Sequence, residues 1–181
     1  MKYEIAYISS SGNTEKLAHG IADSLPHRDT FVTDLSCEEI TGKADVYLIG
    51  FGLKKEAIPL KIMDVLEELE GKTILFFVTA SIKPTEAHVK EVERKLDPFM
   101  PCDCDYKGLY LCPGQVSEET LIRLKTLLEQ EPDNEQAKAA YETCKRTAGR
   151  PNQEDIDDAC DFVREKLRPQ KILCNRHHMT A

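Results

Sequence analysis

The residues best suited to chemistry lie in one short polar loop near the start of the chain. An apolar run over residues 3–8 precedes this loop and a helical pattern follows it, so it is predicted to be a strand-to-helix turn. Backbone amides converge on an anion at such turns, and the helix dipole adds to the attraction. The loop contains no Lys or Arg, and we therefore predict a phosphate site built from neutral donors. Its residues are Ser9, Ser10, Ser11, Gly12, Asn13 and Thr14.

Other phosphate loops fit this turn less well. The sequence has no G-x-x-x-x-G-K-[ST] motif, which argues against a nucleotide triphosphatase. No G-x-G-x-x-G follows the first apolar run, so a dinucleotide fingerprint is also missing. The alternative interpretation is a turn that merely caps a helix, since Ser and Asn are common there.

The elements that must position this loop alternate along the chain. Helical apolar spacing over 17–25, 58–69 and 84–97 separates short apolar runs, of which those at 46–50 and 73–79 are apolar throughout. Strands that alternate with helices imply an α/β fold with a parallel sheet covered on both faces. The five predicted strands are 3–8, 31–32, 46–50, 73–79 and 108–112.

The rhythm changes after the fifth predicted strand. Residues 117–130 and 134–147 both have helical patterns, although five strands need only one closing helix. We predict that 117–148 is a helical insertion before the last helix of a single domain, 1–168. The remaining residues, 169–181, have no clear period and are expected to be a flexible tail.

The loop and its setting resemble the flavodoxin family, whose phosphate loop reads [ST]-x-[ST]-G-N-T after the first strand. Ser9, Ser11, Gly12, Asn13 and Thr14 match every defined position. The resemblance extends over about residues 1–116 and 150–168. It implies a doubly wound five-stranded sheet of order 2-1-3-4-5, with the cofactor FMN above the carboxyl ends of strands 1, 3 and 4.

The same resemblance places the flavin ring between the loops that follow strands 3 and 4. The implied contacts are Phe51, Gly52 and Leu53 in the first loop and Thr79, Ala80, Ser81 and Ile82 in the second. Phe51 is the only aromatic among them and the chain has no Trp, so the usual aromatic sandwich cannot form. Lys54, Lys55 and Lys83 are either ordinary solvated residues or charges that raise the flavin potential.

Composition sets limits on partners and location. The net charge of −8 argues against nucleic acid, and no apolar stretch approaches the length of a membrane span. The start of the chain has no signal pattern, so a cytoplasmic location is expected. Seven cysteines without a Cys-x-x-Cys are expected to be reduced thiols, and Cys102-x-Cys104 with Cys112 matches no common zinc site. The loop at 112–115 follows the fifth strand and is expected to border the pocket.

We therefore expect an FMN-dependent electron carrier with a redox partner protein rather than a stand-alone enzyme. Residues 50–51, 70–72 and 85–88 resemble a divergent bacterial flavodoxin-like group, which includes accessory proteins encoded beside bilirubin reductase. Bilirubin reductase is the partner that this resemblance implies. Two alternatives stay open. One is a flavin enzyme similar to protoporphyrinogen oxidase or FMN reductase, and the other is a flavin-free interaction module on the same fold.

Overall fold

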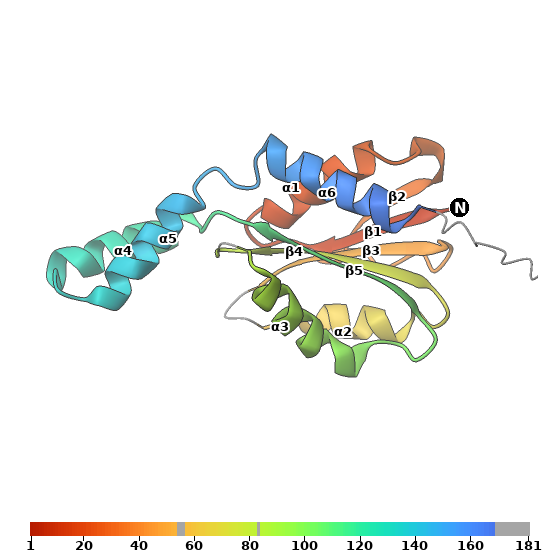
Figure 1. Cartoon of the computed structure of the whole chain (residues 1–181), viewed down its shortest axis with the longest axis horizontal. Helices are drawn as coiled ribbons and strands as arrows, with labels where there is room; N and C mark the ends of the chain where they lie inside the picture. The colour runs from red at the N-terminus through yellow and green to blue at the C-terminus, as the bar shows by residue number, and fades with distance from the viewer. Residues whose placement is uncertain (54–56, 83, 169–181) are drawn as a thin grey trace, which may run out of the picture.

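A computed structural model describes residues 1–53, 57–82 and 84–168 of the chain. Five parallel strands form one sheet in the order β2-β1-β3-β4-β5, as the family resemblance implies. Their carboxyl ends all lie on the same edge, at the left in Figure 1. The strands are β1 (Tyr3–Ile8), β2 (Thr30–Asp34), β3 (Val46–Gly52), β4 (Thr73–Ala80) and β5 (Asp105–Pro113).

Helices cover both faces of the sheet. One face carries α1 (Asn13–Asp23) and α6 (Gln153–Lys166), and the opposite face carries α2 (Leu60–Glu67) and α3 (Glu86–Leu96), as Figure 1 shows. Two short 3-10 turns, η1 (His27–Asp29) and η2 (Asp97–Phe99), connect elements at the far edge. No described helix has the length and apolar character that a bilayer crossing requires.

Alternating side chains of the central strands divide the core into two apolar layers. Tyr47 and Ile49 of β3 face α2 and α3, whereas Val46 and Leu48 face α1 and α6. These four side chains are almost completely buried. Because a central parallel strand is covered on both faces, its sequence is apolar at every position, which explains the uninterrupted runs.

The fifth strand begins earlier than its apolar run indicates. It starts at Asp105, and its register against β4 shifts between Ile74 and Leu75, so that Lys107 has no opposite residue. Gly108 follows this irregularity with φ of +125°, a backbone conformation that residues with a side chain rarely adopt. The first residues of β5 are polar because this edge strand is partly exposed, so the apolar pattern of the sequence does not include the start of the strand.

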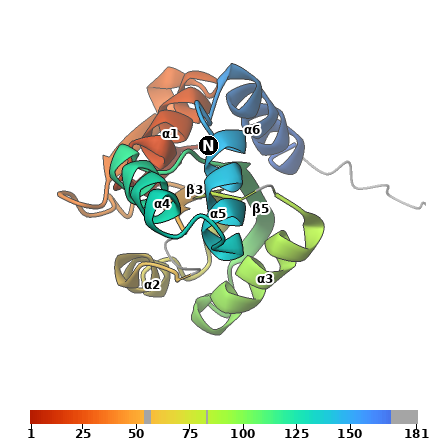
Figure 2. The ribbon, with the colours of Figure 1, turned by 90° about the vertical axis from the view of Figure 1, so that its left-hand side faces the viewer.

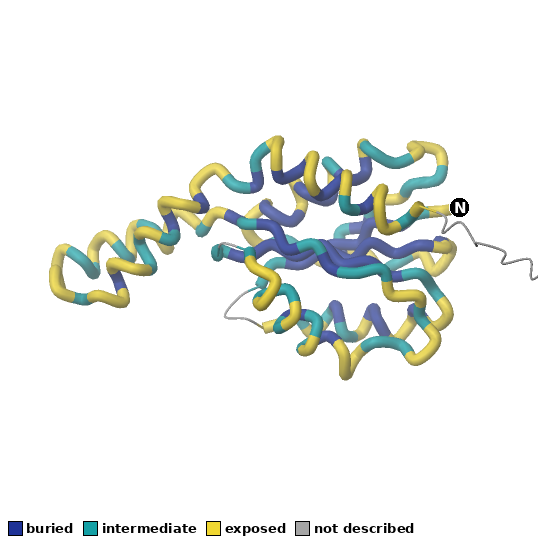
Figure 3. The backbone as a smooth tube through the Cα atoms, in the orientation of Figure 1, coloured by how far each residue is buried: buried dark blue, intermediate teal, exposed yellow. Residues whose placement is uncertain are grey.

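The predicted insertion forms a helical hairpin, α4 (Glu118–Gln130) and α5 (Glu135–Arg146), between β5 and α6. We call this hairpin the arm. It projects from the carboxyl edge of the sheet in Figure 1 and faces the viewer in Figure 2. Figure 3 shows that it is mostly half-buried or exposed, in contrast to the buried sheet. No residue of α4 is buried, because α5 covers only one side of it.

An ion pair between the partly exposed Arg150 and the buried Asp155 fixes the return from the arm to α6. The Arg150 guanidinium donates two hydrogen bonds to the carboxylate of Asp155, which is 2% exposed. Asp155 also accepts from the backbone N–H of Asn152, whose own side chain accepts from the Asp155 N–H. This capping box starts α6. The Arg150 carbonyl accepts from the N–H of Gln115 at 2.8 Å and so joins this return segment to the loop after β5.

Replacing Arg150 with methionine is expected to lower the free energy of unfolding by about 2 kcal/mol, because the Asp155 carboxylate would lose its counter-ion in the interior. Urea denaturation measures the difference. Arg164→Met is the matched control, since Arg164 pairs with Asp161 at an exposed surface site and should change stability by less than about 0.5 kcal/mol. Equal losses in the two variants would show that Asp155 does not depend on Arg150.

Candidate functional site

A pocket of about 360 Å³ lies at the carboxyl ends of β1, β3 and β4. In the sheet, β2 lies on one side of β1 and β3 lies on the other. The order of the strands therefore reverses at β1, which makes this place the topological switch point of the sheet. Open α/β sheets bind ligands at such points because the loops diverge and leave a crevice. The lining residues are Ser10, Ser11, Asn13, Gly52, Leu53, Thr79, Ala80, Ser81, Gln115, Val116, Ser117, Glu119 and Thr120.

The 9–14 loop presents the uncapped start of α1 to this pocket. Gly12 is the residue before the helix, with φ of +80°, and no side chain caps the first turn. Ser10 and Ser11 are exposed and line the pocket. The hydroxyl of Ser9 is buried and has no hydrogen-bond partner among the described residues. Unpartnered donors beside a helix N-terminus are the arrangement that an anion satisfies.

Two long-range hydrogen bonds connect this loop to the rest of the pocket. The buried hydroxyls of Thr14 and Thr79 lie 2.9 Å apart, which joins the start of α1 to β4. The side chain of Asn13 donates to the Gln115 carbonyl at 2.8 Å. A Cβ on Gly114 would lie 2.9 Å from the Asn13 side-chain nitrogen, so this contact requires glycine there. Asn13 and Thr14 therefore hold the pocket together, and Asn13 also forms part of its wall.

The predicted ring contacts divide between the pocket and the rest of the molecule. Gly52, Leu53, Thr79, Ala80 and Ser81 line the pocket. The backbone N–H of Leu53 donates to the Thr79 carbonyl at 2.8 Å, so the two loops are held side by side.

Phe51 and Ile82 are corrections to the sequence-based prediction. The Phe51 side chain is completely buried and packs edge-on against Phe76 in the α2–α3 layer of the core. It therefore has no surface to offer to a flavin ring. Ile82 packs against the same layer and lines a different cavity, on the β5 side of the loop. No aromatic side chain among the described residues lines the pocket.

The arm supplies one wall of the pocket. Val116 and the first turn of α4, with Ser117, Glu119 and Thr120, line this side. The segment 112–115 was expected to border the pocket, and Gln115 does so. These residues directly follow a parallel strand in the sequence. That position indicates that they lie near the pocket, because the segments that follow parallel strands all begin at the carboxyl edge of the sheet.

The pocket is polar and carries little charge. Glu119 is the only charged residue in its described lining, and its carboxylate pairs with Arg123 one helical turn away at the exposed surface. Neutral hydroxyls and amides thus dominate the lining, as predicted for the 9–14 loop. Lys54, Lys55 and Lys83, which we considered as charges near the ring, lie outside the described residues.

Cys112 lies in β5 just before the pocket and is completely buried. Burial, together with the nearby Asp155 carboxylate, raises the pKa of its thiol to about 12. The thiol therefore stays neutral across the physiological pH range.

We expect iodoacetamide to alkylate Cys112 at least about a hundredfold more slowly than Cys37 and Cys102 in the native protein, because those two thiols are exposed. Peptide mass mapping after a short pulse at mildly alkaline pH measures the rates. Denaturant should make all three react alike. Rapid alkylation of native Cys112 would contradict the packing at the end of β5.

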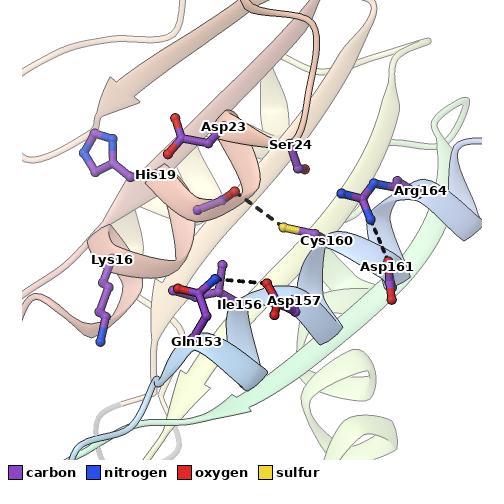
Figure 4. Close-up of a pocket in the computed structure, with 11 residues that line it drawn as sticks. Lys16, His19, Asp23, Ser24, Gln153, Ile156, Asp157, Cys160, Asp161 and Arg164 are labelled. Atoms are coloured by element: carbon purple, nitrogen blue, oxygen red, sulfur yellow. Dashed lines mark hydrogen bonds and ion pairs between the residues drawn. The ribbon is translucent and has the colours of Figure 1, made fainter.

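A groove of about 690 Å³ lies away from these loops, between α1 and α6 (Figure 4). Most of its polar groups are already partnered. The Cys160 thiol contacts the Gly20 carbonyl, Gln153 donates to Asp157, and Arg164 pairs with Asp161. The helices pack closely here, because a Cβ on Gly20 would lie 2.4 Å from Ile156. The groove is therefore a consequence of helix packing and offers no convergent donors to a ligand.

Comparisons with known proteins agree with this architecture. A family model described as flavodoxin domain matches residues 4–164. A protein of Clostridioides difficile (strain CD3), named flavodoxin-like domain-containing protein BilS, is 24% identical over 176 residues, which are 96% of this chain and 100% of that protein. A protein with the same name from Clostridium symbiosum (strain WAL-14163) is 26% identical over 155 residues, covering 76% of this chain and 81% of the other.

Solved structures with a similar fold include two flavoproteins. A flavoprotein in complex with FMN from Lactobacillus acidophilus NCFM has 15% identity and a TM-score of 0.48, and covers 61% of this chain and 92% of that one. Two-electron reduced Megasphaera elsdenii flavodoxin has 17% identity and a TM-score of 0.48, and covers 79% of this chain and 98% of that one.

Proposed function

This chain belongs to the flavodoxin domain family, and on that premise we propose that it binds FMN and passes electrons to a partner protein. The observation that carries the proposal is the uncapped N-terminus of α1 beside the buried, unpartnered hydroxyl of Ser9. A phosphate group would satisfy both, since it accepts several hydrogen bonds and is attracted by the helix dipole.

Each part of the pocket has a role in this proposal. The first-turn amides of α1 and the hydroxyls of Ser9, Ser10 and Ser11 hold the phosphate. Leu53 and Val116 offer apolar surface to the ring in place of aromatic side chains. The bond between Thr14 and Thr79 keeps the phosphate end and the ring end at a constant separation. Bound FMN supplies one- and two-electron chemistry, and the protein supplies position and access.

The arm is the part of the molecule that we propose as the partner surface. It begins in the wall of the pocket and extends away from the sheet, so a protein bound to it would lie close to the flavin. Bilirubin reductase is the first partner to test, because the sequence resembles a group that includes its accessory proteins. Deletion of the arm, with β5 and α6 joined by a short linker, should slow electron transfer without abolishing FMN binding.

Titration of the purified chain with FMN and with riboflavin tests the proposal. We expect saturable binding of one FMN per chain, seen in the visible flavin spectrum, and weaker binding of riboflavin, which lacks the phosphate. Reduction of the flavin should then lead to partner reduction, without rapid consumption of NADPH by the chain alone. Fast NADPH turnover in the absence of a partner would instead indicate an enzyme.

One observation favours a second candidate, a flavin-free interaction module. The described lining of the pocket lacks the aromatic surface on which a flavin ring stacks, and such stacking contributes about 1 kcal/mol per partner. The same titration separates the candidates, because a colourless protein without saturable FMN binding would reject both flavin functions.

A further inference from the structure

Another cavity, of about 680 Å³, lies on the β5 side of the loop that follows β4. Its walls come from Ile82, the edge strand β5, the start of α3, the end of α5 and the start of α6. We call it the β5 cavity. Its volume lies within the usual range for small-molecule sites, whereas the pocket at the switch point is near the lower limit of that range.

Most of the lining surface of the β5 cavity is apolar. Ile82, Leu111 and Pro113 line it together with Tyr110. The Tyr110 hydroxyl donates to the Asp155 carbonyl, which leaves its ring as part of the wall. Burial raises the pKa of this hydroxyl, so the group stays neutral. Such a surface favours a flat hydrophobic body over a sugar or a free ion.

Charged groups also line the β5 cavity, and most of them come from two helices. Arg150 and Asp155 neutralise each other through their paired hydrogen bonds. Arg146 at the end of α5 and Asp158 in α6 also line the cavity, and neither has an ion-pair partner among the described residues. His88 from the first turn of α3 lines it as well. Among the described residues of the lining, the Arg146 cation and the Asp158 anion thus remain available to a ligand.

The β5 cavity is separate from the pocket at the switch point but lies next to it. The two share no lining residue, yet Ser81 lines the first and its neighbour Ile82 lines the second. A molecule in the β5 cavity would therefore lie across one loop from the proposed flavin site. Binding there is a property of this cavity alone and does not require flavin.

We propose that the β5 cavity binds a flat, hydrophobic organic acid that carries a hydrogen-bond donor, such as an amino group, away from its carboxylate. The carboxylate pairs with Arg146, the donor bonds to Asp158, and the apolar body lies against Ile82, Leu111 and Pro113. A molecule with acid groups at both ends fits less well, because one of them would approach the Asp158 carboxylate.

Fluorescence titration of the full-length protein with an aminonaphthoate tests this proposal. The probe is a bicyclic aromatic acid with an amino group on the ring opposite its carboxylate. We expect saturable binding that is tighter than that of naphthalene dicarboxylate. Arg146→Gln should weaken the aminonaphthoate and the parent naphthoate by about fivefold, whereas Asp158→Asn should weaken only the aminonaphthoate, by about threefold.

The chain offers a matched control beside each variant. Lys145→Gln removes the neighbouring cation, which pairs with Glu142, and Asp157→Asn removes the neighbouring anion, which lines the groove between α1 and α6. Neither change should alter probe binding. Thr143→Trp, which places an indole in the cavity wall, should prevent binding by filling the space.

Absence of saturable binding, or equal losses in the Arg146 and Lys145 variants, would overturn the proposal. Retained binding in Thr143→Trp would also overturn the proposal, because the probe would then bind outside the β5 cavity. FMN titration of these variants provides a separate readout, since the proposed flavin site uses none of these residues. If the probe does not bind in the β5 cavity, the test of flavin binding is unaffected. If FMN does not bind, the result of the probe titration still stands.

Discussion

Replacing Gly50 with alanine is expected to lower the free energy of unfolding by about 3 kcal/mol. Gly50 lies in the middle of β3, and a Cβ there would lie 2.1 Å from the ring of Phe77 on the neighbouring strand. Both residues are buried, and the Phe77 ring packs in the core layer beneath α1 and α6, which resists its displacement. Denaturation with urea measures the loss, which should be among the largest for any single methyl group in this chain.

A second substitution separates overpacking from other effects of alanine. Phe77→Leu removes the ring that the new methyl group would meet, so adding Gly50→Ala to Phe77→Leu should cost much less than Gly50→Ala alone. Coupling of this kind is expected for two residues in direct contact. Additive losses would mean that the methyl group disturbs the strand by some other route.

Replacing Ser11 with aspartate is expected to weaken FMN binding by at least about a hundredfold. Ser11 lines the pocket in the 9–14 loop, where no described basic side chain is present to offset a new charge. The carboxylate would repel the FMN phosphate across a few ångströms. Titration of FMN against the variant measures the effect.

Three comparisons make this prediction specific to the phosphate. Riboflavin should bind the Asp variant nearly as it binds the unmodified protein, and Ser11→Asn should retain most of the FMN affinity because it keeps a neutral donor. The variant should also remain fully folded, since a carboxylate near a helix N-terminus is stabilising. Equal losses for FMN and riboflavin would place the phosphate away from this loop.

Much of the fold follows from local sequence patterns. The apolar runs of β1, β3 and β4 predicted three strands, and the structure confirms the order 2-1-3-4-5 that the family resemblance implies. The edge strand β5 was only partly predicted, because Asp105 and Lys107 are polar and the strand is irregular before Gly108. An edge strand needs fewer apolar residues, so its pattern carries less information.

The ring side of the candidate site was harder to predict for a different reason. A strand that is apolar at every position does not show which face each side chain takes, and Phe51 lies in the core rather than in the pocket. Moving one residue along an extended chain changes the face on which the side chain lies. The neighbours Ser81 and Ile82 accordingly line different cavities. The arm was predicted as a helical insertion, but only the structure shows which of its residues line the pocket.

The sequence by itself determined the order of strands and helices and the position of the polar loop after the first strand, because both depend on residues close together in the chain. Only the tertiary structure decided which side chains form the pocket. The hydrogen bonds between Asn13 and Gln115 and between Thr14 and Thr79 join positions 102 and 65 residues apart. Such contacts depend on strand register and helix packing, which arise from the whole core and leave no local pattern.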